Sequence, residues 1–117
     1  MQQADALTAL GSLAAAVRLE VFRLLVRQGP EGLVAGEIAV ALDLAPSNLS
    51  FHLKALTQAG LLSVEQEGRF QRYRAHMPLM RELIAYLTEE CCAGHPELCA
   101  DLRPAVACAP ARRTADV

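Results

Sequence analysis

Three of the four cysteines in this chain lie close together near its C-terminal end. Cys91 and Cys92 are adjacent, and Cys99 follows after a short stretch that contains Gly94 and Pro96. Glycine and proline favour turns, which would bring the third thiol back toward the adjacent pair. Thiolates bind soft ions, so three cysteines within nine residues favour a soft-ion site where a lone cysteine would not.

Other roles for these cysteines stay open. Cys91 follows Leu87 by four residues, so it could simply pack in an apolar interface. With His95, the three cysteines also supply the four ligands of a closed tetrahedral zinc site. A thiol redox switch is a further alternative. It is disfavoured by the carboxylates of Glu89 and Glu90, which oppose the thiolate that such a switch needs.

The composition indicates a small folded protein. The chain has 117 residues, of which 53% are hydrophobic, and this suits a single globular domain. The N-terminus lacks the basic and apolar segments of a signal peptide, and no apolar run approaches the ~20 residues of a membrane helix. We therefore expect a cytoplasmic protein with reduced thiols, in which an even number of cysteines does not indicate disulfides.

Charge is distributed unevenly along the chain, although the formal net charge is only −2. Between residues 44 and 76, basic side chains outnumber acidic ones, whereas between residues 82 and 101 every charged side chain is acidic. A small net charge thus conceals a basic middle region and an acidic C-terminal region.

The elements that must position these residues are mainly helices. Helical periodicity predicts helices over residues 5–14, 16–28, 35–42, 46–59 and 78–92. Gly29 and Pro30 would end the second helix, while Pro46 and Pro78 suit the first turn of the helices that they open.

After residue 60 the periodicity changes to that of strands. Strands are predicted over residues 61–66 and 70–75, with a turn at residues 67–69 in which Gly68 is free to take a positive φ. Residues 103–117 are rich in alanine and proline without any period, which predicts a flexible tail. Cys108 lies in this tail and is interpreted as incidental.

Two helices joined by a few residues and followed by a β-hairpin form the winged helix-turn-helix arrangement, whose second helix enters the major groove of DNA. The helix that begins at Pro46 is expected to fill this role. Its inward face is predicted to be Leu49, Leu53 and Leu56. The opposite face carries small polar groups, an amide and a cation, which suit base edges and phosphates. The residues expected to contact DNA from this helix are Ser47, Asn48, Ser50, Phe51 and Lys54.

Two aromatic residues of this helix each have two interpretations. Phe51 is a large apolar side chain on the polar face, so it either touches a thymine methyl group or makes an ordinary surface contact. His52 lies at the edge of the leucine face. We expect it to pack there and to form a hydrogen bond with the backbone, in preference to a base contact.

The predicted hairpin carries arginines. Arg69 lies near its tip, and Arg72 and Arg74 share one face of a strand, with Tyr73 on the other. Arginines on a two-stranded hairpin can bind phosphates or the minor groove, and we expect this role for all three. The alternative is a solvated strand face.

Three runs resemble the ArsR/SmtB family of bacterial metal-sensing repressors: 16-AVRLEVFRLL-25, 37-EIAVAL-42 and 47-SNLSFHLKALTQAGLLSVEQEGRFQRYR-74. The resemblance covers about residues 5–90. It implies a mainly α fold with a β-hairpin wing, a homodimer formed through the first and last helices, and a roughly palindromic double-stranded operator. Apolar stripes in the first and last predicted helices agree with such a dimer.

The resemblance also implies an inducer site, whose position differs among family members. Residues 35–42 contain no cysteine, and residues 78–90 contain neither histidine nor aspartate, so two of the family's sites are absent. Cys91, Cys92 and Cys99 resemble the ligands of the arsenite-responsive subgroup. The resemblance therefore implies a repressor released from its operator by trivalent arsenic, with antimonite, cadmium, lead or zinc as alternative ions.

The predicted organisation is a DNA-binding and dimerisation domain over residues 1–92, an inducer-binding segment over 91–102 and the tail over 103–117. No cofactor is expected to be needed for DNA binding. We do not expect an enzyme, because the sequence has no nucleotide-binding loop, no CxxC motif at a helix start and no acid–base cluster. A small thiol enzyme and a constitutive DNA-binding protein with idle cysteines are the rival classes.

Overall fold

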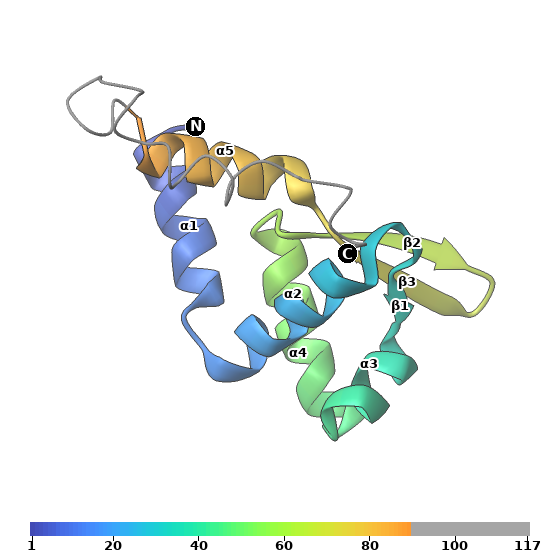
Figure 1. Ribbon diagram of the computed structural model, residues 1–117. Helices are drawn as coiled ribbons and strands as arrows, with labels where there is room; N and C mark the ends of the chain where they lie inside the picture. The colour runs from blue at the N-terminus through green and yellow to red at the C-terminus, as the bar shows by residue number, and fades with distance from the viewer. Residues whose placement is uncertain (90–117) are drawn as a thin grey trace. The chain divides into compact units, whose positions relative to one another are not determined.

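The computed structural model describes residues 1–89, whose helices and strands are labelled in Figure 1. The helices are α1 (Gln3–Leu13), α2 (Ala16–Gln28), the short 3-10 helix η1 (Gly29–Glu31), α3 (Ala35–Leu42), α4 (Pro46–Gln58) and α5 (Met77–Leu87). The strands are β1 (Leu33–Val34), β2 (Leu62–Glu67) and β3 (Phe70–Ala75). The predicted fold class, mainly α with a β-hairpin wing, is confirmed.

The helix boundaries lie within two residues of the predicted ones except at the end of α5. The bounds of α2 and α3 are those predicted, and α4 begins at Pro46. The prediction that the last helix continues to residue 92 is wrong, because residues 88 and 89 form a turn. The hydroxyl of Thr88 donates to the Ile84 carbonyl at 2.7 Å, and the Glu89 amide bonds three residues back to Tyr86. Such bonds tighten and end a helix.

By its contacts the chain divides into two compact units, Met1–Leu83 and Ile84–Val117. The described part of the second unit continues α5 to Leu87 and ends in the turn just described. Several predictions fall outside the described residues: the cysteines at 91, 92, 99 and 108, the histidine at 95, and the tail over 103–117. None of the helices within residues 1–89 has the length and the apolar composition that a membrane span requires.

The core of the first unit is formed by the helices and by the start of β2. Leu49, Leu53 and Leu56 of α4 are at most 2% exposed, which confirms the predicted inward face. The other fully buried large side chains are Val21 and Leu25 of α2, Ile38 of α3 and Leu61. Burial of this set determines how α4 is rotated about its axis, because one face must stay in the core.

The sheet has three antiparallel strands in the order β1-β3-β2. The hairpin β2–β3 extends away from the helices and forms the wing (Figure 1). Its turn consists of Gly68 and Arg69, between the paired residues Glu67 and Phe70, and Gly68 has a φ of +62°. A tight hairpin requires positive φ at this position, and glycine adopts it without strain. β1 was not predicted, since two residues are too few to show a period.

Candidate nucleic-acid interface

α4 presents its polar face to solvent. The burial of its three leucines leaves the residues predicted to contact DNA on the outside of the helix. All of them are exposed: Ser47, Asn48, Ser50, Phe51 and Lys54. The ring of Phe51 is 66% exposed, so a large apolar surface stands among hydroxyl and amide groups. This helix face therefore carries polar side chains that can form hydrogen bonds with base edges and an apolar side chain that can contact a thymine methyl group.

A hollow joins this helix face to the wing. It is lined by Ser50, Lys54, Thr57 and Gln58 of α4 and by Val64, Gln71 and Tyr73 of the two long strands. Residues of the helix and of the hairpin thus share one continuous surface. Arg69 is exposed in the hairpin turn, and within residues 1–89 neither Arg69 nor Lys54 forms an ion pair. Both cations can therefore meet phosphates without first breaking such a pair.

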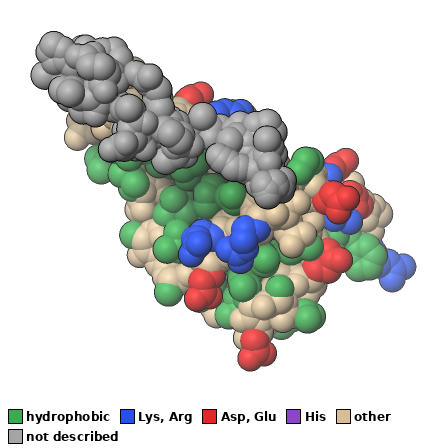
Figure 2. All heavy atoms as spheres, viewed as in Figure 1, with side chains coloured by type: hydrophobic (Ala, Val, Ile, Leu, Met, Phe, Trp, Pro, Cys, Tyr) green, Lys and Arg blue, Asp and Glu red, His purple; other side chains and the backbone are tan. Residues whose placement is uncertain are grey.

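Arg72 and Arg74 lie on the face of β3 opposite Tyr73, as the strand alternation predicts, but two nitrogens of each guanidinium already donate to other residues of the protein. Arg72 Nε lies 2.9 Å from Glu67 Oε2, and its Nη1 donates to the Glu31 carbonyl at 3.1 Å. Figure 2 shows acidic and basic side chains side by side on the part of the surface that the hairpin forms. This pairing neutralises the charge that a phosphate contact would use.

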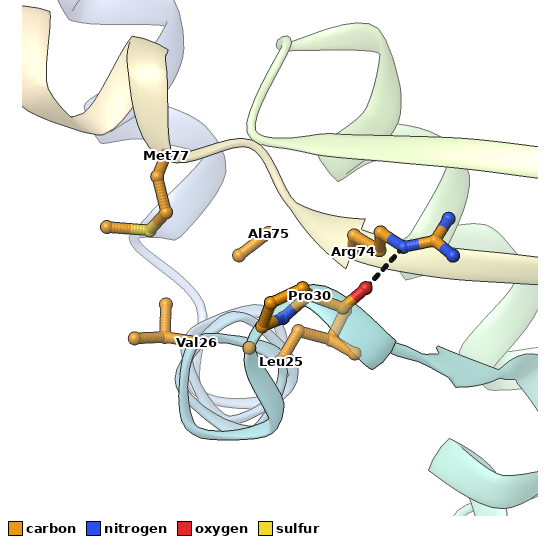
Figure 3. A pocket seen from close by; sticks show the side chains of 7 residues that line it. Leu25, Val26, Pro30, Arg74, Ala75 and Met77 are labelled. Atoms are coloured by element: carbon orange, nitrogen blue, oxygen red, sulfur yellow. Dashed lines mark hydrogen bonds between the residues drawn. The ribbon is translucent and has the colours of Figure 1, made fainter. Parts of the chain in front are cut away.

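Arg74 is held in the same way. Its Nη1 lies 2.7 Å from Glu65 Oε1, and its Nε donates to the Pro30 carbonyl at 2.7 Å, the bond drawn in Figure 3. The stem of Arg74 lines an otherwise apolar hollow with side chains of α2 and of the start of α5, among them Val26 and Met77. Arg74 therefore joins the wing to η1, whereas a DNA contact by Arg72 or Arg74 stays a prediction.

His52 is half-buried, as expected, but the prediction that it bonds to the backbone is wrong. Its Nδ1 lies 3.3 Å from Nη1 of Arg18, a residue of α2. Its ring packs edge-on against Phe51, with 5.4 Å between ring centroids and 72° between planes. The sequence alone did not indicate this contact. No local pattern links residues 34 positions apart.

The described residues contain no candidate metal centre. Within residues 1–89, no three histidine, cysteine, aspartate or glutamate side chains come together in a way that could hold an ion. The ligands proposed from sequence, Cys91, Cys92 and Cys99, and the zinc alternative with His95 all lie outside these residues.

Comparisons with known proteins agree with this geometry. A family model described as a helix-turn-helix domain matches residues 13–65. A homodimeric winged helix-turn-helix DNA-binding domain from Mycobacterium bovis, described as a possible ArsR-family regulator, is 26% identical with a TM-score of 0.61. The match covers 79% of this chain and 85% of that one. Reduced HlyU from Vibrio cholerae is 30% identical with a TM-score of 0.57, and the match covers 72% of this chain and 88% of HlyU. The chain belongs to the helix-turn-helix regulators of the ArsR/HlyU type.

A curated relative of this ArsR/HlyU-type regulator matches only in part. An uncharacterized helix-turn-helix transcriptional regulator of Bacillus subtilis, YdfF, is 48% identical over 40 residues, which are 34% of this chain. The matched stretch is 18% of YdfF, so the likeness concerns a small part of that protein.

Proposed function

We propose that this ArsR/HlyU-type regulator is a transcriptional repressor that binds double-stranded operator DNA through α4 and the wing. The observation that carries the proposal is the face of α4 opposite the buried leucines, where Ser50, Phe51 and Lys54 are all exposed. The hollow that this face shares with β2 and β3 extends the surface toward the exposed Arg69. Helix and hairpin together match what a major groove and its flanking backbone require.

The proposed active form is a homodimer. α1 buries only the small side chains of Ala6 and Ala9, while Leu7 is 60% and Leu10 is 39% exposed. A second protomer would remove this apolar surface from water, which is the main favourable term in association. The relative from Mycobacterium bovis is itself described as homodimeric. A two-fold dimer would read two half-sites about one turn of DNA apart.

Trivalent arsenic is the proposed inducer, with Cys91, Cys92 and Cys99 as its ligands. The support is chemical: three thiols within nine residues suit a thiophilic ion that takes three thiolates. Binding would reorganise the segment after α5 and lower the affinity of the dimer for DNA. Such coupling typically amounts to ~1–3 kcal/mol and is reciprocal, so operator DNA would weaken arsenic binding by the same factor.

A thiol redox switch is the second candidate for the signal. The observation that favours it is the likeness to HlyU, which was solved in a form described as reduced. Oxidation would join or modify the same cysteines that arsenic would bind, so the two signals act on one set of side chains. Zinc, held with the help of His95, is the remaining ion to be tested.

Fluorescence anisotropy of the full chain on labelled DNA tests these proposals together. The probe is a duplex that the reduced protein selects from a random-sequence pool, at fixed salt because affinity depends steeply on it. Arsenite, zinc and a mild thiol oxidant are added separately. Release by arsenite from wild type and from the matched control Cys108→Ser, but not from Cys99→Ser, is the expected result.

Each other outcome has a definite meaning. Release by zinc alone, lost in His95→Gln, would replace arsenic by zinc. Release by the oxidant alone would favour the redox switch. Selective binding that no addition changes would identify a constitutive DNA-binding protein, and failure to select any duplex would contradict DNA recognition itself.

A further inference from the structure

Arg18 of α2 connects the end of α1 to the recognition helix α4. Its Nε donates to the Ser12 carbonyl at 2.5 Å, and its Nη1 lies 3.3 Å from Nδ1 of His52. Ser12 also reaches α4 directly, because its hydroxyl lies 3.4 Å from the Ala55 carbonyl. One guanidinium and one serine thus join the C-terminal end of α1 to the middle of α4.

The chemistry of the Arg18–His52 contact requires one form of the histidine. A guanidinium has only donors, so Nδ1 must accept, and the ring hydrogen must sit on Nε2. A doubly protonated imidazole has no acceptor and would place a second cation beside Arg18. Within residues 1–89, neither side chain is paired with a carboxylate that could offset this repulsion.

The contact leads onward to the exposed face of α4. Besides Arg18 of α2, His52 contacts the ring of Phe51 on α4 itself. Through Arg18 it is also connected to Ser12 of α1, which carries no charge. The edge of one aromatic ring meets the face of the other, an arrangement with a preferred geometry. Phe51 is the large apolar group among the exposed residues of this helix face.

We propose that Arg18 and His52 are positioning residues that set the orientation of Phe51 and of α4 for selective DNA recognition. The proposal rests on the proposed function: Arg18 and His52 would hold in place the face of α4 that contacts DNA. The path Ser12–Arg18–His52–Phe51 also runs from α1, the proposed dimer helix, to a base-reading side chain. A change in how α1 packs would therefore reach the reading face through these side chains.

The sign of the pH dependence separates positioning from simple charge. DNA is a polyanion, so an extra proton on α4 would strengthen binding if His52 acted only as a cation. Positioning predicts the opposite, because the proton removes the acceptor for Arg18.

The test compares wild type with His52→Asn, whose side-chain oxygen can replace Nδ1 as the acceptor but does not titrate. His76→Gln is the matched control, since His76 is an exposed histidine outside the contact. Anisotropy is measured on the selected duplex and on a scrambled one at several pH values. From about pH 7.5 to 5.5, wild type and His76→Gln should lose about tenfold in affinity for the selected duplex relative to His52→Asn.

Arg18→Met, which keeps the aliphatic stem and removes the donors, is the second variant. It should bind the selected duplex about tenfold more weakly at neutral pH, while binding to the scrambled duplex changes by less than about twofold. Equal pH profiles for wild type and His52→Asn would overturn the proposal even if Arg18→Met failed to fold. Wild type that selects no duplex would instead contradict the proposed function.

Discussion

The guanidinium of Arg74 joins the wing to η1: its Nη1 lies 2.7 Å from Glu65 on β2, and its Nε donates to Pro30 in η1 at 2.7 Å. Arg69, in the turn of the same hairpin, has no ion-pair partner within residues 1–89. The arginines of the wing therefore divide by role. Arg72 and Arg74 hold the hairpin to its surroundings, and Arg69 is available to a phosphate.

This division predicts different effects of two single substitutions on DNA binding. Arg69→Ala should lower the slope of log affinity against log salt by about one, because one phosphate contact is lost. Arg74→Ala should leave the slope nearly unchanged. It should lower the free energy of unfolding by only about 1 kcal/mol, since the ion pair is partly exposed to solvent. Salt titrations by anisotropy and urea unfolding measure the two effects. A lower slope for Arg74→Ala would show that Arg74 of the wild type leaves Glu65 and contacts a phosphate when the protein binds DNA.

Gly32 is expected to be intolerant of any side chain. It has a φ of +60°, and a Cβ at this position would collide with the carbonyl oxygen of Tyr73 on β3. Gly32→Ala should therefore lower the free energy of unfolding by about 3 kcal/mol, from backbone strain together with displacement of β3. Gly36→Ala is the control, because nothing lies within 4 Å of a Cβ there and alanine favours a helix. Equal urea midpoints for the two variants would contradict the crowding at Gly32.

The exposed leucines of α1 predict where the dimer forms. Leu7→Ser should weaken dimerisation by about tenfold or more, since two copies of the side chain leave the interface. Val40→Ser is the matched control, because Val40 is 83% exposed but lies on α3. Sedimentation velocity over a range of concentrations measures both. Weaker dimerisation of Val40→Ser with an unchanged Leu7→Ser would place the interface on α3.

The burial of Tyr73 predicts that the protein loses stability in alkaline solution. Burial raises the pKa of Tyr73 above the ordinary value of 10.0, because an ionised phenol is poorly solvated inside the protein. The unfolded chain then releases this proton at a lower pH than the folded chain. The stability contribution is fully present below about pH 10 and is lost as the pH rises through the folded-state pKa.

Tyr73→Phe removes this titration. The hydroxyl of Tyr73 donates to Gln71 at 3.0 Å, so the variant should be about 1 kcal/mol less stable at neutral pH. Its free energy of unfolding should nevertheless fall less steeply than that of wild type between about pH 9 and 11. Urea unfolding under reducing conditions gives both slopes, and parallel slopes would refute the role of Tyr73.

Much of the fold and of the exposed face of α4 was predictable from sequence. The spacing of Leu49, Leu53 and Leu56 predicts which face of α4 is buried, and this in turn exposes Ser50 and Lys54. The prediction succeeds because a helix repeats every 3.6 residues and a hydrophobic face must leave water. Gly68 marks the hairpin turn for a similarly local reason, the need for a positive φ.

The sequence by itself thus determined the helices and strands that show a clear period, the inward face of α4 and the cluster of three cysteines whose ligand stays a prediction. Only the tertiary structure decided that Arg18 meets His52, that Arg74 bonds to Pro30 and that β1 pairs with β3. Along the chain, the first pair is 34 positions apart, the second is 44, and the paired residues Leu33 and Tyr73 of the strands are 40. The periodicity of a sequence indicates which residues of one helix or strand are buried, whereas contacts between distant residues depend on how the elements pack against one another.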